Sequence, residues 1–254
     1  NDPYVIAGQG TIGLEILEQL PDVEQVVVPI GGGGLISGIA FAIKSLKPAC
    51  RVIGVQAATV ASMYESRKAG EVTTVNDGDT IADGIHVLTP GELTFELCQK
   101  YVDDIVTVSE DEICAAMLAL MEGQKTVSEG AGATTVAACM FGKVDTSSKK
   151  TACVVSGGNV DVTTLSRVIT KGLVKSGRLA DISARVLDKP GSLIQLLQVV
   201  SESGANIVSI NHVRDDEHAD VNTCIVSMVL ETRDITHVRQ IKQALRDKGY
   251  SFVN

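Results

Sequence analysis

Four consecutive glycines, Gly31 to Gly34, are the residues whose type and spacing most directly indicate chemistry in this sequence. They follow a short apolar run, 26–30, and precede an apolar stretch with helical character, 35–43. Because glycine has no side chain, successive backbone N–H groups can turn toward one anion, and the N-terminal end of the following helix attracts negative charge. The sequence therefore predicts a phosphate-binding loop.

The residues around the glycines narrow the class of phosphate compound. No Lys-Ser or Lys-Thr pair follows the last glycine, as an ATP-binding P-loop requires, and the run does not have the G-x-G-x-x-G spacing of dinucleotide-binding proteins. ATP and NAD are therefore disfavoured as ligands. The alternative is a glycine-rich turn between a strand and a helix that binds nothing.

The composition predicts a cytoplasmic protein with a sizeable core. Of the 254 residues 44% are hydrophobic, but no apolar stretch reaches the roughly 18 residues of a membrane-spanning helix. A net charge of −9 without a basic cluster disfavours nucleic-acid binding. The six cysteines are scattered without C-x-x-C spacing, which is typical of reduced thiols, and the four histidines form no ligand pattern, so we expect no metal site.

The hydrophobic periodicity of the first two thirds predicts an α/β domain with a parallel sheet. Short Val- and Ile-rich runs alternate with helical stretches, and parallel strands joined by crossover helices are the simplest arrangement for that order. Ser109 and Glu112 are predicted to form a capping box, and Asp161 is predicted to cap the last helix. We expect strands at 26–30, 51–56, 105–109 and 151–156, and helices at 11–20, 35–46, 62–69, 91–102, 111–124, 130–141 and 161–170.

The pattern changes after residues 171–178 to the order β-α-β-β-α-β, which is typical of a ferredoxin-like α+β module. Strands are expected at 180–187, 205–214, 221–232 and 250–253, helices at 192–203 and 234–248, and a polar turn at 215–220. We predict domains at 1–172 and 180–254, joined by a linker at 173–179. A second copy can complete the edges or the open face of such a module, and we expect a homo-oligomer formed through this module and the larger domain.

Five segments of the larger domain resemble fold-type II pyridoxal-phosphate enzymes, particularly the threonine/serine dehydratases of the short catabolic threonine ammonia-lyase type. They occur in family order through about residue 172: 4–11, the glycine run within 28–38, Ile-Ala-Asp-Gly at 81–84, Ser-Glu-Gly-Ala-Gly-Ala at 128–133, and Ser-Gly-Gly-Asn at 156–159. Residues 188–193 and 204–207 resemble an ACT regulatory domain, a C-terminal module known in this dehydratase family.

The resemblance implies a bound pyridoxal 5′-phosphate. Ser156 would face its pyridine nitrogen. A neutral hydroxyl cannot keep that nitrogen protonated as a carboxylate does, and this favours elimination over transamination. The cofactor phosphate would be held by Gly31, Gly32, Gly33, Gly34 and the N–H of Leu35.

Three further residues would be neighbours of the cofactor pocket on the same resemblance: Asp83, Gly84 and Glu129. For Glu129 the alternative is a carboxylate favoured by the dipole at the start of the predicted helix 130–141. For the Ser-Gly-Gly-Asn segment the alternative is an ordinary turn between a strand and a helix.

The family's Schiff-base lysine belongs to a motif well before the glycine run, and residues 1–30 contain no lysine. Lys44, Lys47, Lys68, Lys100 and Lys125 have no matching context. We therefore expect this chain to be the C-terminal part of a dehydratase, with no catalytic residue of its own and inactive by itself. The alternative is a non-catalytic fragment that senses amino acids and oligomerises.

The intact enzyme that the resemblance implies eliminates water from L-threonine and releases 2-oxobutyrate and ammonia, in amino-acid metabolism and isoleucine biosynthesis. L-Serine is the other expected substrate, and a serine dehydratase or serine racemase is the alternative. Racemases of this family place acidic metal ligands near the positions of Gln56 and Ser62. An amide and a hydroxyl disfavour a hard cation, so we expect no metal there and a racemase is less favoured.

The turn from 188 to 192 is the informative part of the ACT segment. A Pro-Gly pair bends the chain tightly from strand to helix and leaves amides at the helix N-terminus to meet a ligand carboxylate. A purely structural turn beside a dimerising sheet is the alternative. For allosteric regulation by an amino acid, the expected effector-binding residues are Asp188, Pro190, Gly191 and Ser192, with Asn206 and Ile207 completing the pocket across a dimer.

Overall fold

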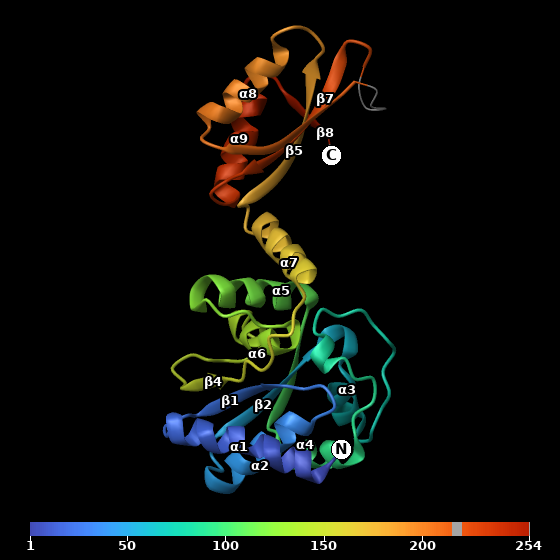
Figure 1. Cartoon of the computed structure of the whole chain (residues 1–254), viewed down its shortest axis with the longest axis vertical. Helices are drawn as coiled ribbons and strands as arrows, with labels where there is room; N and C mark the ends of the chain where they lie inside the picture. Colours follow the sequence, from blue (N-terminus) through green and yellow to red (C-terminus); the bar gives the residue numbers. More distant parts are fainter. Residues whose placement is uncertain (215–219, 254) are drawn as a thin grey trace. The chain divides into compact units, whose positions relative to one another are not determined.

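The structure is a computed structural model that describes residues 1–214 and 220–253. The chain forms two compact units, Asn1–Val168 and Ile169–Asn254 (Figure 1). The division falls within helix α7 (Val162–Lys175), which extends beyond the predicted end at residue 170 and includes residues 173–175 of the predicted linker. Among the described residues, no helix is both long and apolar enough to cross a membrane.

The sheet of the first unit is parallel, as predicted. Its strands are β1 (Gln25–Pro29), β2 (Arg51–Ala57), β3 (Asp104–Val108) and β4 (Thr151–Cys153), in the order β3-β2-β1-β4. Gln25 is in register with Arg51 on one side and with Thr151 on the other. The fourth strand is shorter than predicted because only three of its residues are in the ladder, although the N–H of Val154 still donates to Val27 O at 2.9 Å.

Helices flank this sheet and bury its two faces separately. Val26 and Val28 contact one hydrophobic cluster with α2, whereas Val27 contacts the other with α5 and α6. This alternation follows from the period of two along a strand. The helices are α1 (Pro3–Gln19), α2 (Gly34–Leu46), α3 (Ser62–Ala69), α4 (Glu92–Tyr101), α5 (Glu110–Ala119), α6 (Gly130–Met140) and α7, with short helical turns at Ala58–Val60, Asp83–Ile85 and Leu120–Gln124.

Helix α1 begins at Pro3, not at residue 11 as predicted. Asp2 caps it by accepting the N–H of Tyr4 at 2.8 Å, and proline suits the first turn of a helix. The helix packs closely on α2, where a Cβ atom on Gly38 would lie 2.2 Å from Ile6 O. Tertiary packing therefore maintains a helix through a segment whose glycines have low helix propensity.

The second unit has the ferredoxin-like order that the sequence predicted. Its elements are β5 (Leu179–Leu187), α8 (Ser192–Glu202), β6 (Asn206–Val213), β7 (Thr223–Glu231), α9 (Ile235–Asp247) and β8 (Ser251–Val253). The strands pair antiparallel in the order β6-β7-β5-β8. One face of the sheet packs with α8 and α9 in a single hydrophobic cluster. Most of the predicted polar turn, 215–219, lies outside the described residues.

Candidate cofactor site

The glycine run forms the turn between β1 and α2. Gly33 is the N-cap of α2 and adopts the left-handed conformation, with φ at 92°, which favours glycine. A Cβ atom on Gly33 would lie 2.7 Å from Met63 Cε and 2.9 Å from Thr94 Cβ. Backbone conformation and packing therefore both require glycine at this position.

The N-terminus of α2 fits an anion. The N–H of Ser37 donates to Gly33 O at 3.0 Å. The N–H groups of Gly34, Leu35 and Ile36 precede it, and a helix provides no carbonyl partner for its first N–H groups. The first turn has no acidic residue. The helix dipole and these N–H groups together favour a phosphate at this position.

Thr94, from α4, fixes the conformation of the glycine loop. Its fully buried side chain places Oγ1 2.6 Å from the carbonyl oxygen of Gly32. A hydrogen bond to the loop carbonyl holds the peptide groups of the turn in one orientation. Thr94 was not among the predicted site residues, because it lies 62 positions after Gly32 in the sequence and belongs to no local motif.

The other predicted segments meet the loop at the carboxyl edge of the sheet. A Cβ atom on Gly31 would lie 3.0 Å from Ile85 Cα, so the loop contacts the turn that contains Asp83 and Gly84. A Cβ atom on Gly84 would in turn lie 2.8 Å from Glu129 Oε1. Strand β4 pairs with β1, so the residues after both strands reach the same edge. Asp83 itself is exposed.

Glu129 lies between the Gly84 turn and the segment after β4. A Cβ atom on Gly157 would lie 2.3 Å from Glu129 Oε1, and Oε2 accepts the N–H of Asn159 at 3.2 Å. Glu129 is the N-cap of α6, but its side chain does not cap that helix. The carboxylate therefore accepts a hydrogen bond from the glycine turn beside Ser156. This differs from the alternative that Glu129 only interacts favourably with the dipole of the helix that follows it.

Ser156 is half-buried and follows the end of β4. Helix α6 approaches its backbone, since a Cβ atom on Gly132 would lie 2.5 Å from Ser156 O. The neighbouring Gly157 has a φ of 88°. The structure thus gathers the glycine loop, the Asp83–Gly84 turn, Glu129 and Ser156 into one region, and their role as a cofactor pocket stays a prediction.

The predicted effector turn lies in the second unit, between β5 and α8. Gly191 has a φ of 90° and is the N-cap of α8. A pocket of about 380 Å³ is lined by Asp188, Pro190 and Gly191 from the turn and by His212 and Arg214. The structure therefore brings part of the predicted effector residues to one pocket. Ser192 is buried at the start of α8.

Asn206 and Ile207 lie at the other end of β6 from His212. The side-chain amide of Asn206 donates to Glu231 Oε2 at 2.9 Å, and Ile207 packs against the core of the second unit. Within one chain, the described residues that line the pocket do not include either of them. Their role across a dimer stays a prediction.

Comparison with known proteins agrees with this geometry. Residues 1–157 match the family described as pyridoxal-phosphate dependent enzyme, and residues 180–247 match the ACT domain. The chain therefore belongs to the family of pyridoxal-phosphate-dependent enzymes and contains an ACT domain.

Two curated relatives indicate the activity found in this family. The chain is 53% identical over 250 residues to the L-threonine ammonia-lyase of Thermotoga maritima, covering 98% of this chain and 62% of the relative. It is 55% identical over 170 residues to the catabolic L-threonine dehydratase TdcB of Escherichia coli, covering 66% of this chain and 52% of the relative. The chain thus spans less than two thirds of the length of either relative.

Two solved structures share the fold. The processed form of threonine deaminase isoform 2 from Solanum lycopersicum has a TM-score of 0.63 and 38% identity, covering 67% of this chain and 50% of that chain. The serine racemase of maize has a TM-score of 0.61 and 38% identity, covering 69% of this chain and 54% of that chain. The fold alone is therefore shared by a deaminase and a racemase.

Proposed function

We propose that the complete polypeptide containing this chain is an L-threonine ammonia-lyase that releases 2-oxobutyrate and ammonia and is regulated through its ACT domain. The meeting of the glycine loop, Glu129 and the Ser156 segment at one edge of the sheet supports this function. The identity of 53% to an L-threonine ammonia-lyase supports threonine as the substrate.

The residues present fit pyridoxal 5′-phosphate. We propose that the N–H groups of the glycine loop and of Leu35 bind its phosphate, and that the Ser156 hydroxyl faces its pyridine nitrogen. When bound, this cofactor supplies an electron sink for the bonds at the amino-acid Cα. Ser156 remains neutral near pH 7, so it orients the ring without holding a proton on it. Gly84 and Glu129, which lie close to one another, would border the cofactor pocket.

We place the cofactor-linked lysine outside these 254 residues. The ammonium group of Lys44 is 2.8 Å from the Asp103 carboxylate and also donates to Cys50 O at 2.8 Å. That of Lys47 donates to Pro21 O at 2.7 Å. Neither Asp103 nor Pro21 belongs to the segments that meet the glycine loop, which supports structural roles for both lysines.

Serine racemization is the second candidate function, since a maize racemase shares the fold. Gln56 Oε1 accepts the N–H of Tyr64 at 2.8 Å, and Ser62 Oγ donates to Val87 O at 2.6 Å. Both side chains are neutral, buried and bonded to the backbone. A divalent cation at this position would lack carboxylate ligands, which supports elimination over a metal-dependent racemization.

Assays of the complete polypeptide distinguish these functions. Incubation with L-threonine should yield equal amounts of 2-oxobutyrate and ammonia, and L-serine should yield pyruvate. Formation of D-serine faster than pyruvate would overturn the proposal. For the 254-residue chain, treatment with pyridoxal 5′-phosphate and borohydride followed by peptide mapping should give no specific lysine adduct. A single adduct at one lysine would contradict an external Schiff-base lysine.

We also propose an amino-acid effector at the turn from Asp188 to Gly191 and a homo-oligomer formed through the ACT domain. Strand β6 is an edge of its sheet and exposes Val208 and Ile210, which supports pairing with a second copy. The six free cysteines are compatible with the cytoplasm as the location. Equilibrium dialysis with isoleucine, valine, threonine and serine tests the effector, and sedimentation tests the oligomer. A monomeric chain that binds none of the four would contradict both.

A further inference from the structure

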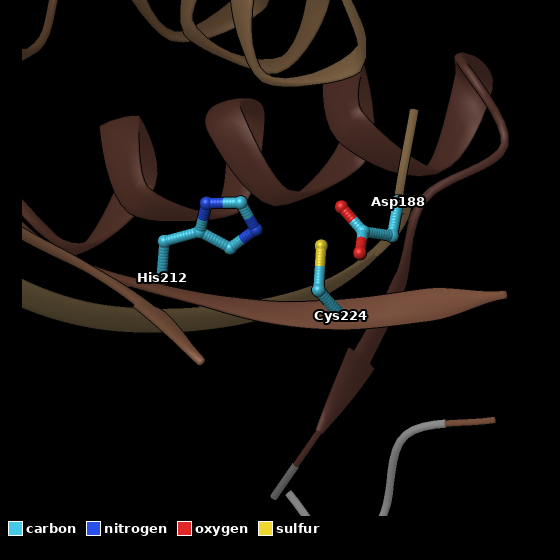
Figure 2. Close-up of side chains that lie close together, drawn as sticks. All are labelled: Asp188, His212 and Cys224. Atoms are coloured by element: carbon cyan, nitrogen blue, oxygen red, sulfur yellow. The ribbon is translucent and has the colours of Figure 1, made fainter. Parts of the chain in front are cut away.

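Three side chains from separate elements of the second unit converge at one point. Asp188 follows β5, His212 is on β6 and Cys224 is on β7, and one ligand atom of each lies within 4.8 Å of the other two (Figure 2). All three belong to the pocket of about 380 Å³. Donors of three chemical types therefore share one cavity.

The sheet register explains why they meet. Strand β7 lies between β6 and β5, and Cys224 is paired with Val186, two residues before Asp188. His212 is paired with Val226, two residues after Cys224. Because alternate residues of a strand point to the same face, His212 and Cys224 share a face. The cluster is thus a product of strand pairing, and the spacings of 24 (212 − 188) and 12 (224 − 212) residues match no metal motif in the sequence.

We propose that Asp188, His212 and Cys224 bind a divalent transition-metal ion of the zinc type. A thiolate, an imidazole and a carboxylate are the three donors that Zn²⁺ takes from proteins, whereas Mg²⁺ and Ca²⁺ require more oxygen ligands. Three protein ligands leave one position of a tetrahedral ion open to water. This site lies in the other unit from the cofactor site, and it shares Asp188 and its pocket with the proposed effector turn, so the metal and an amino-acid effector would meet in one cavity.

The side chains need to move only slightly to bind the ion. Bonds of about 2.0–2.3 Å in a tetrahedron place donor atoms about 3.5 Å apart, about 1 Å closer than the present limit of 4.8 Å. Cys224 is 2% exposed and fixed within the sheet. His212 is exposed, and the Asp188 side chain is 33% exposed, so these two can rotate toward the buried sulfur.

The Asp188 carboxylate is the anionic group beside the buried Cys224 sulfur. A bound cation stabilises the thiolate and neutralises its repulsion with Asp188, so metal binding would release a proton. The thiol would lose its hydrogen bond to Val186 O, at 3.4 Å.

Arg214 and Lys189 are the cations that oppose the ion in this pocket. Arg214 Nε donates to Asp188 Oδ2 at 2.9 Å. A carboxylate has two oxygens, so Asp188 can bind the metal with Oδ1 while Arg214 keeps Oδ2 and orients the group. The positive charge nearby lowers the affinity, and we expect binding weaker than at a structural zinc site.

Cobalt titration of the reduced, chelator-treated 254-residue chain tests this site. We expect one Co²⁺ per chain, a thiolate-to-cobalt charge-transfer band in the near ultraviolet, and loss of that band on addition of Zn²⁺. Cys224→Ser should abolish the band. His212→Gln and Asp188→Asn, which change exposed side chains, should each weaken binding at least about tenfold.

Two matched variants serve as controls. Cys139→Ser removes a thiol of the first unit, and His86→Gln removes an exposed imidazole of the first unit; both should keep the band and the affinity. Persistence of the band in Cys224→Ser, its loss in Cys139→Ser, or unchanged affinity in His212→Gln would each overturn the proposal. If Cys224→Ser does not fold, as judged by circular dichroism, His212→Gln and Asp188→Asn decide the outcome.

Discussion

Thr94 Oγ1 lies 2.6 Å from the carbonyl oxygen of Gly32 and 2.9 Å from that of Gly91, which joins the first turn of α4 to the glycine loop. The hydroxyl has one proton, and the shorter contact is the one to the loop. Gly32 belongs to the loop for which we propose phosphate binding, whereas Thr94 does not. Their hydrogen bond nevertheless determines how the peptide groups of the loop are oriented.

Replacement of Thr94 by valine should therefore destabilise the first unit. The change keeps the shape but leaves a loop carbonyl without its partner, and we expect a loss of about 1–3 kcal/mol in the free energy of unfolding. Urea denaturation without cofactor measures it. Thr94→Ser retains the hydroxyl and is the control; equal stability of the two variants would contradict a role for the hydrogen bond.

Alanine substitutions at the neighbouring Gly33 and Gly34 should differ in their effect on stability. Gly33→Ala should cost at least about 2 kcal/mol, because the left-handed conformation is unfavourable for alanine and the new Cβ overlaps Met63 and Thr94. Gly34→Ala, at the first residue of α2 with no atom within 4 Å of its Cβ, should leave the stability of the chain within about 0.5 kcal/mol or raise it. Thermal unfolding of both variants without cofactor measures the difference. Equal losses would show that the loop tolerates a side chain.

The buried Cys98 predicts a loss of stability in alkali. Burial raises the pKa of its thiol to about 11 from 9.0, although the Ser37 hydroxyl and Arg67 act in the opposite direction. The unfolded chain therefore releases this proton at a lower pH than the folded chain, so the contribution is complete below pH 9 and is lost as the pH rises toward 11. The difference in unfolding free energy between wild type and Cys98→Ala should shrink by about 2–3 kcal/mol over this range. A constant difference would contradict the raised pKa.

The Sγ atoms of Cys139 and Cys153 lie 3.5 Å apart, between α6 and β4. The hydrogen bond from Cys153 holds the pKa of the Cys139 thiol below its usual value, which favours its reaction as a thiolate. Diamide should therefore consume this pair of thiols first, as counted with a thiol reagent. Cys139→Ser should prevent the loss, and Cys50→Ser should leave it unchanged. Equal oxidation of all three proteins would exclude preferential pairing.

Local signals in the sequence predicted the fold well where strands and helices begin with clear patterns. The capping box is one example: Glu112 N donates to Ser109 Oγ at 3.3 Å, and Ser109 N donates to Glu112 Oε2 at 2.8 Å. Asp161 also accepts the N–H of Thr164, as expected of a cap. The early part of α1 was missed because close packing of its glycines on α2 outweighs their low helix propensity.

The residues of the candidate sites also differ in whether local sequence signals indicate them. The glycine loop and the Ser156 segment are each a short continuous stretch of sequence, so their residue types alone indicated them. Thr94 and the proposed metal ligands depend on which strands and helices become neighbours. Their spacing in the sequence differs from any local motif, and only the fold brings them together.

The four glycines of the loop between β1 and α2 also affect how readily this part of the chain opens. Glycine loses more backbone entropy on folding than any other residue, so this loop is costly to order without a ligand. A bound phosphate group stabilises the ordered form by mass action. If the loop binds the cofactor phosphate as proposed, a larger fraction of cofactor-free molecules should open at this loop and become accessible to proteases, which limited proteolysis with and without pyridoxal 5′-phosphate measures.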